Sequence, residues 1–197
     1  MSHGRLIILK FGGSVLRDEA SLGGAVHEIY RWRRDGWRVL AVVSALGGRT
    51  DELLARANRL GLGAESPARA ALAAGGEREC AALLSAMLER SGLPVACLSA
   101  GLRAEGSPVD ARPTGASTAH LRAALARTGT VVCPGYVASD RRGRDVLLGR
   151  GGSDLSALCL LRSLRAARCL LVKDVDGLYD RDPAAAGPAA RRFRTAG

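Results

Sequence analysis

Two lysines are the residues of this chain whose type and position most clearly suggest chemistry. Lys10 and Lys173 are the only lysines among 29 basic residues, and each closes an apolar, strand-like run, RLIILK and CLLVK. A compact ammonium group is a point charge that suits a phosphate pocket, whereas arginine presents a planar fork. The alternative is chance placement of two residues, and the pattern suggests phosphate binding.

Glycine-rich or polar segments follow four of the predicted strands. Glycine lacks a Cβ, so backbone N–H groups can approach an anion, and the N-terminus of a following helix adds positive charge. In open α/β sheets, ligands bind beyond the carboxyl ends of the strands. One glycine pair is more often a structural turn, but four such loops together predict phosphate binding. These loops are residues 10–14, 44–48, 149–154 and 173–177.

The common phosphate-binding motifs are absent from the sequence. There is no G-x-x-x-x-G-K-[ST] segment, and GRGGSD lacks the third glycine of G-x-G-x-x-G. The H-R-D and D-F-G motifs of protein kinases are missing as well. The sequence therefore excludes the P-loop and protein-kinase plans.

The elements that would position these loops alternate along the chain. Its 197 residues are 47% hydrophobic and 24% charged, which is typical of one globular domain. Strand and helix patterns in alternation predict a three-layer α/β/α fold with a mainly parallel sheet covered on both faces. We predict strands at 5–10, 38–43, 95–99, 130–139 and 167–174, helices ending near 34 and covering 50–60, 67–90, 117–127 and 153–164, and a polar loop at 101–116.

Composition also bounds the partners and the compartment. No apolar run approaches the length of about 20 residues that spans a bilayer, and no cleavable leader is evident, so we expect no membrane contact. Five cysteines without a C-x-x-C pair are typical of reduced core residues in a cytoplasmic protein, and we expect no metal cluster or disulfide framework.

The net charge of +10 permits nucleic-acid binding as an alternative. The basic residues are scattered along the chain, however, and aromatic residues make up only 4% of it, which is few for base stacking. We therefore expect no nucleic-acid partner.

Six segments resemble the successive motifs of aspartate kinases within the amino acid kinase superfamily. The resemblance covers nearly the whole chain and implies the amino acid kinase fold across residues 1–197. It also implies transfer of the γ-phosphoryl group of ATP to the side-chain carboxylate of L-aspartate, the first step in making the aspartate-derived amino acids, lysine and threonine among them. The segments are KFGGS (10–14), VVSALGGRTDELL (42–54), GERECAALL (76–84), PGYVASDRRGR (134–144), LLGRGGSDLSAL (147–158) and DVDGLYDRDP (174–183).

The resemblance implies roles for the residues around the phosphates. Lys10 would contact the transferring phosphoryl group, and Asp154 would orient that lysine and the start of its helix. Asp154 could also be a helix-start acid that favours the helix dipole. Mg²⁺ would arrive with ATP on phosphate oxygens and water, without a protein metal site. The other nucleotide-binding residues implied are Gly12, Gly13, Ser14, Lys173, Asp174 and Tyr179.

It likewise implies an aspartate pocket. Arg150 would bind the α-carboxylate through its fork and Glu77 the ammonium group, with Ser44, Thr50 and Ser153 as hydrogen-bond partners. Taken without the motifs, Glu77 is a solvated acid near a helix start and Ser44 or Thr50 a helix cap.

Three features depart from the aspartate kinase pattern. Lys173 stands where the family commonly has Thr, and Ala184 where it commonly has Arg, with Arg181 as a possible replacement for that charge. The family domain also continues through a further segment with a second nucleotide-facing lysine, so we expect the C-terminal part of the domain and any regulatory domain to be missing.

The resemblance also implies a homodimer, which is the usual assembly of the family. Alternatives are a non-catalytic nucleotide-binding or regulatory subunit and a kinase that acts on another small acid.

Overall fold

The structure is a computed structural model that describes residues 5–175, 177, 179–181 and 189–193. Its centre is a five-stranded, fully parallel sheet in the order β3-β6-β2-β1-β9. Each strand is a short run rich in β-branched or other apolar residues, which favours the extended chain. The strands are β1 (Leu6–Phe11), β2 (Arg38–Val43), β3 (Ala96–Cys97), β6 (Thr130–Pro134) and β9 (Arg168–Val172).

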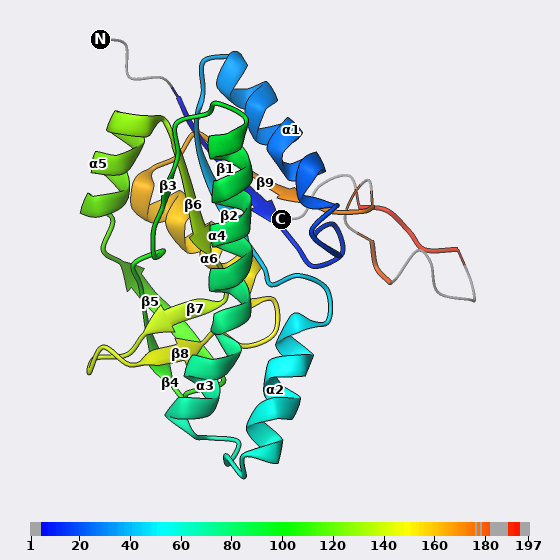
Figure 1. The fold of residues 1–197 in the computed structure, drawn as a ribbon, viewed down its shortest axis with the longest axis vertical. Coiled ribbons are helices and arrows are strands. Elements are labelled where there is room, and N and C mark those ends of the chain that lie inside the picture. Colours follow the sequence, from blue (N-terminus) through cyan, green and yellow to red (C-terminus); the bar gives the residue numbers. More distant parts are fainter. Residues whose placement is uncertain (1–4, 176, 178, 182–188, 194–197) are drawn as a thin grey trace.

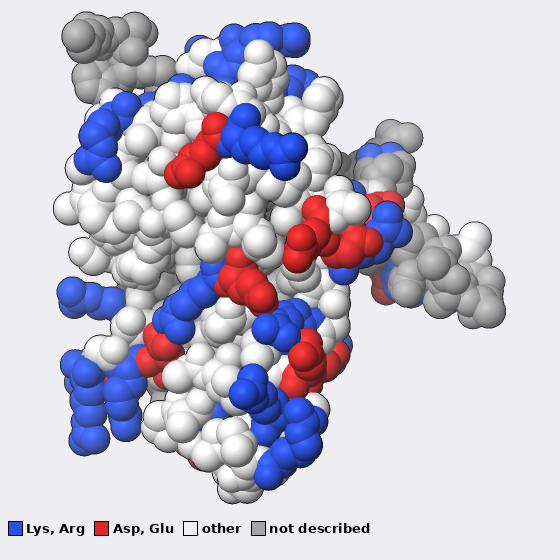
Figure 2. Space-filling model, in the orientation of Figure 1, with Lys and Arg blue, Asp and Glu red and all other residues white. Residues whose placement is uncertain are grey.

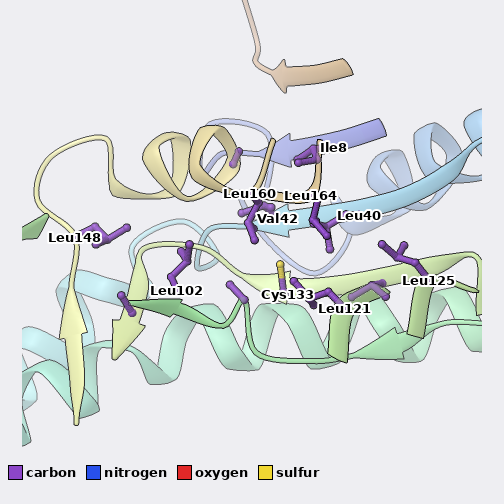
Figure 3. Close-up of a cluster of buried hydrophobic side chains, with 14 of the residues drawn as sticks. Ile8, Leu40, Val42, Leu102, Leu121, Leu125, Cys133, Leu148, Leu160 and Leu164 are labelled. Carbon is purple, nitrogen blue, oxygen red and sulfur yellow. The ribbon is translucent and has the colours of Figure 1, made fainter. Parts of the chain in front are cut away.

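Helices cover both faces of this sheet (Figure 1). Successive side chains of a strand point to opposite faces, and β1 shows this directly. Ile7 and Leu9 pack in the cluster formed with α1 (Leu22–Arg34) and α4 (Gly75–Arg90). Ile8 packs in the other cluster, with α5 (Ala119–Thr128) and α6 (Gly152–Leu164), as Figure 3 shows. The three-layer α/β/α fold is therefore confirmed.

A second sheet of four short strands lies beside the first, in the order β5-β4-β7-β8. The pairs β4–β5 and β7–β8 are antiparallel, and β4 meets β7 in parallel. Ala70 and Ala73 of α3 pack on Val137 and Leu147 of this sheet. Its elements and their helical neighbours are β4 (Leu102–Gly106), β5 (Ala111–Ala116), β7 (Val137–Ser139), β8 (Asp145–Leu147), α2 (Arg49–Arg59) and α3 (Pro67–Ala73).

The prediction of a polar loop at 101–116 was wrong, because this segment is the β4–β5 hairpin. The sequence of β5 does not indicate a strand because it contains Pro113 and Gly115: proline removes a ladder donor and glycine weakens a strand. β5 lies at the edge of the small sheet, where a strand tolerates such residues.

Other predicted elements differ in extent. The run at 130–139 divides into β6 and β7 because Tyr136 adopts a left-handed conformation with φ of 65°. The helix at 67–90 is two helices, which meet at Ala74. The expected strand at 95–99 keeps only Ala96 and Cys97 in the ladder.

Strand β9 is an edge strand of the large sheet, and its side chains are less covered than predicted. Leu170 and Leu171 are 37% and 41% exposed, and Leu158 on the neighbouring α6 is 49% exposed. The two-sided cover is therefore complete over the central strands and partial at β9. Among the described residues, the structure has no helix that combines the length and the hydropathy needed to cross a bilayer.

Candidate active site

A cavity of about 840 Å³ lies where the two sheets meet. It opens at the carboxyl ends of β1, β2 and β9, which contribute Lys10, Ser44 and Lys173. Arg150 of the β8–α6 connection and Asp154 of the first turn of α6 complete this wall. The expectation that the glycine loops would gather beyond the strand ends is met because parallel strands all end at the same edge.

Asp154 holds two ammonium groups at one side of the cavity. Lys10 Nζ lies 2.5 Å from Asp154 Oδ1, and Lys173 Nζ donates a hydrogen bond to Oδ2 over 3.1 Å. Lys10 is 5% exposed, so its position is fixed by packing, whereas Lys173 is more open. One carboxylate therefore sets the spacing of two positive charges that come from neighbouring strands.

Burial and charge move the pKa values of this group in different directions. Burial lowers the pKa of Lys10, and Lys173 adds to this, while contact with Asp154 opposes it. Burial by itself would raise the pKa of Asp154, but its bonds to Lys10 and Lys173 outweigh that effect and lower it. Asp154 is thus held as a carboxylate beside its two lysines.

Two helices begin in the wall of the cavity. Helix α2 starts after Gly48 and α6 after Gly151, and both glycines are left-handed, with φ of 76° and 73°. A positive φ is costly for residues with a Cβ, so glycine permits these sharp entries. The free N–H groups of a first turn attract anions. A Cβ on Gly12 would lie 3.0 Å from Lys10 Nζ, which explains the glycine beside this lysine.

Glu77 is a buried carboxyl group in the same cavity. It lies in the first turn of α4, is 3% exposed, and accepts one hydrogen bond from Ala45 N at 3.4 Å through Oε1. Its Oε2 has no partner within the described structure. Burial raises the pKa of Glu77 to about 7. Glu77 lines the cavity, and a carboxyl group with an unsatisfied oxygen is suited to accept bonds from a cationic group.

Hydroxyl groups line the wall between these charged residues. Ser44 Oγ and Ser153 Oγ lie 2.9 Å apart, which ties the end of β2 to the start of α6. Tyr136 N donates a hydrogen bond to Ser156 Oγ over 2.9 Å. The ring of Tyr136 packs against Gly152. The left-handed conformation of Tyr136 brings this ring into the cavity wall.

Most of the predicted site residues come together. Those that line the cavity are Lys10, Gly13, Ser44, Thr50, Glu77, Arg150, Ser153, Asp154 and Lys173. Gly12 adjoins the cavity through Lys10. Ser14 and Asp174 are exposed and lie outside the lining, and Tyr179 forms a β-bridge with Arg192 instead. Ala184, which stands where aspartate kinases commonly have Arg, lies outside the described residues.

Four further lining residues were not singled out from the sequence: Asp51, Val109, Asp110 and Tyr136. Val109 and Asp110 belong to the turn of the unpredicted β4–β5 hairpin. Tyr136 lies within PGYVASDRRGR, so the motif itself was the available signal. Asp51 likewise belongs to a segment that carried the resemblance.

The fold is that of the amino acid kinase class of proteins. The sequence profile of the Amino acid kinase family matches residues 5–196, and the chain belongs to this family. Its sequence is similar to aspartokinases. It is 32% identical to the Thermus thermophilus enzyme over 195 residues and 33% identical to the Pseudomonas aeruginosa enzyme over 194 residues.

Solved structures agree on the fold. E. coli aspartokinase III in complex with aspartate and ADP superposes with a TM-score of 0.76 at 23% identity, over 95% of this chain and 53% of that one. Isopentenyl phosphate kinase gives 0.70 at 24% identity, over 94% of this chain and 78% of that one.

The alignments with the curated relatives cover 98% and 95% of this chain but only 48% and 46% of the relatives. The chain therefore spans about half the length of the curated relatives that it matches.

Proposed function

We propose that this chain transfers the γ-phosphoryl group of ATP to the side-chain carboxylate of L-aspartate, giving 4-phospho-L-aspartate and ADP. The observation that carries the proposal is the pair of lysines that contact Asp154. They line the same cavity in whose wall helices α2 and α6 begin. Similarity to aspartokinases supports aspartate as the acceptor. The product would enter the biosynthesis of the aspartate-derived amino acids.

This reaction requires little acid–base chemistry from the protein. The acceptor carboxylate is ionised at neutral pH, so its oxygen can attack the γ-phosphorus while the bond to the β–γ bridging oxygen breaks. Catalysis then depends on in-line positioning and on neutralising charge at the transferring group. Lys10, fixed by burial and by Asp154, supplies that charge without the cost of reorganising at the moment of reaction.

The acceptor pocket follows from the remaining charges. Glu77 would accept bonds from the aspartate ammonium group, which satisfies its unpartnered Oε2. Arg150 is exposed at the cavity rim and would bind the α-carboxylate through its fork. Ser44, Thr50 and Ser153 would orient the substrate by hydrogen bonds.

The nucleotide would place its phosphates near Lys10, Lys173 and the amides of Gly12 and Gly13. By resemblance, Ser14, Asp174 and Tyr179 would contact the rest of the nucleotide. Mg²⁺ would come with ATP and neutralise phosphate charge. The described residues contain no group of three or more His, Cys, Asp or Glu arranged to hold an ion. Asp154, which faces the same space, is engaged by its two lysines.

We further propose that residues 1–197 act as an amino acid kinase domain in the cytoplasm and form a homodimer, as the resemblance implies. Sedimentation equilibrium of the native protein tests the assembly. A mass of twice 20.5 kDa supports the dimer, and a monomer that does not change with concentration contradicts it.

Trapping of the acyl phosphate with hydroxylamine tests the function. Protein with MgATP, aspartate and hydroxylamine should yield aspartyl hydroxamate, and glutamate or other small acids in place of aspartate should yield much less. Arg150→Ala should raise the KM for aspartate far more than that for ATP, whereas Arg142→Ala, an exposed arginine outside the cavity, should change neither.

A nucleotide-dependent thermal shift without hydroxamate from any acid would contradict the enzyme and favour a non-catalytic nucleotide-binding subunit. Greater turnover with another acid would keep the kinase and overturn its acceptor. Absence of both the shift and the hydroxamate would overturn the proposal as a whole.

A further inference from the structure

A second hollow, of about 350 Å³, lies at the opposite end of the parallel sheet and is lined by four arginines. They are Arg5, Arg38, Arg122 and Arg165, and the rest of the lining within the described chain is apolar, without an Asp or Glu side chain. Half of the lining residues thus carry a positive charge. The walls between them come from the ends of the hydrophobic core, such as Leu125 and Leu164.

The strands and helices explain why these arginines meet. Arg5 directly precedes β1, and Arg38 is the first residue of β2, so both lie at the amino ends of parallel neighbours. Arg165 follows the last turn of α6, and Arg122 projects from α5. The active-site cavity uses the other ends of β1 and α6. Five residue steps separate Arg5 from Lys10, which is about 16 Å at the rise of a strand.

Three of the four arginines have no carboxylate partner among the described residues. Within the described residues, no carboxylate forms an ion pair with Arg5, Arg122 or Arg165. Arg122 donates one hydrogen bond, from Nη2 to Ser163 O over 3.1 Å, and a guanidinium group has five donors. Like charges that share one concave site repel each other, so an anion bound among them would relieve that repulsion.

Arg165 occupies a backbone conformation that favours glycine. It caps α6 with φ of 51° and ψ of 45°, where its N–H bonds to Leu161 O and Arg162 O. Helices usually end on glycine or asparagine in this conformation, because a Cβ makes it costly. The chain therefore keeps a guanidinium group beside the hollow at a position where glycine would be the more stable choice.

We propose that this arginine hollow binds a small phosphate-bearing anion, of which a diphosphate group is the best match. Guanidinium forks pair with phosphate oxygens in bidentate geometry, and arginines from different elements can surround such a group. The volume lies at the lower end of the range of about 300–1,000 Å³ for small-molecule sites. The site is separate from the cavity around Lys10, and the proposal does not depend on which acid that cavity phosphorylates.

A small anion fits the observations better than a nucleic acid. A duplex or single strand needs an extended basic surface that follows its backbone. On the face drawn in Figure 2, Lys and Arg side chains stand in separate groups, several beside Asp or Glu. The arginine hollow is local and concave, with apolar walls.

The protein contains a built-in reporter at this end of the sheet. Its two tryptophans are Trp32 and Trp37, whose rings contact each other edge to face at 5.3 Å between centroids. The guanidinium carbons of Arg5 and Arg168 lie 5.9 Å and 5.5 Å from the centre of the Trp37 ring. An anion that draws Arg5 into the hollow would change the emission of Trp37.

The test is a tryptophan-fluorescence titration of the whole protein with sodium pyrophosphate in buffer of low ionic strength. We expect a saturable change in emission. Arg122→Gln should weaken the apparent affinity by about tenfold, because one charge-assisted contact is lost. Arg127→Gln, on the same helix but outside the hollow, should change it less than twofold. Lys10→Ala should also leave it within twofold, since that lysine belongs to the other cavity.

Arg165→Gly separates binding from folding. It removes a guanidinium group and relieves the left-handed backbone, so the thermal midpoint should stay equal or rise while pyrophosphate affinity falls. ADP serves as a second probe in the Lys10→Ala protein. If ADP displaces pyrophosphate from the hollow, the natural diphosphate belongs to a nucleotide. If ADP does not displace it, the natural ligand is free pyrophosphate.

Three results would overturn the proposal. One is the absence of a saturable signal, and another is a signal that Lys10→Ala abolishes while Arg122→Gln leaves it intact. The third is tighter binding of a 20-mer oligonucleotide than of pyrophosphate with the same dependence on Arg122, which would identify a nucleic-acid surface. Hydroxamate formation is measured separately, so failure of this site and failure of the proposed kinase activity are distinguishable.

Discussion

Lys10 Nζ lies 2.5 Å from Asp154 Oδ1, although 143 residues separate them in the chain. The contact joins the end of strand β1, which lies inside the large sheet, to the first turn of α6. It buries an ammonium group at the point where the glycine loops converge, and the carboxylate keeps that group in one position. The proposed phosphoryl transfer depends on this pair.

Removal of the Lys10 ammonium group should abolish most catalysis. Lys10→Ala is expected to lower kcat by at least about 100-fold, which is the usual effect of losing one preorganised group that stabilises developing charge. The thermal shift with ADP should shrink as well. Arg142→Ala serves as the control for loss of a surface charge. A fall of less than tenfold in hydroxamate formation would contradict the role given to Lys10.

Asp154 is expected to act by positioning rather than by binding phosphate. Asp154→Asn removes the negative charge that orients Lys10 and Lys173, so kcat should fall by about 100-fold, as for a misplacement of about 1 Å. The site becomes more positive, so the Kd for ADP should stay equal or decrease. Calorimetry with ADP, beside steady-state rates, checks this split. Weaker ADP binding together with an unchanged kcat would be the opposite of the expected result.

Glu77 should make folding stability depend on pH. Burial raises its pKa to about 7 in the folded protein, against an ordinary value of 4.5 for glutamate, so the folded state favours the protonated carboxyl group. Below pH 4.5 both states are protonated and Glu77 brings no penalty. As pH rises to 7, the unfolded chain releases its proton first and stability falls, by about 3 kcal/mol at 1.36 kcal/mol per pKa unit.

Glu77→Gln isolates this effect, since glutamine cannot ionise. The stability difference between Glu77→Gln and the wild type should therefore grow from pH 4.5 to 7 in favour of the variant, and then stay constant. Urea unfolding at several pH values measures it. A difference that does not change with pH would show that Glu77 ionises in the folded chain as easily as in the unfolded one. The variant should also raise the KM for aspartate.

Gly152 should tolerate no side chain. A Cβ there would lie 2.5 Å from Tyr136 Cδ2 and 2.9 Å from Leu148 Cβ. Gly152→Ala must therefore displace the start of α6, at a cost of about 1–3 kcal/mol. Gly24→Ala is the matched control, because Gly24 lies in helix α1 with open space around its Cβ position and should gain about 0.5–1 kcal/mol. Equal melting temperatures for the two variants would contradict this packing.

The large sheet and the phosphate end of the site could be predicted because both follow from local signals. The run at 38–43 is β2 without change, and the helix predicted from 153 to 164 is α6, which begins one residue earlier. Lys10 and Lys173 end neighbouring parallel strands, so the fold rule alone places them at one edge. Because α6 begins at the same edge, its first-turn residue Asp154 can contact both lysines.

The rest of the site depends on long-range packing that no local pattern encodes. Tyr136 enters the cavity because of its positive φ, which is uncommon for an aromatic residue. Asp110 lies in the turn of the β4–β5 hairpin, and the proline and glycine of β5 led to the prediction of a loop there. The burial of Glu77 arises from the approach of α4 to the Ala45 backbone, so an acid that alone suggested a solvated helix start became a buried group.

The measurement that tests the central claim most directly is a crystal structure of the protein with ADP bound. The account predicts that Lys10 Nζ lies about 3 Å from an oxygen of the β-phosphate, with Asp154 still in contact with the lysine. A diphosphate bound elsewhere, with Lys10 still enclosed by protein and remote from any phosphate oxygen, would contradict it.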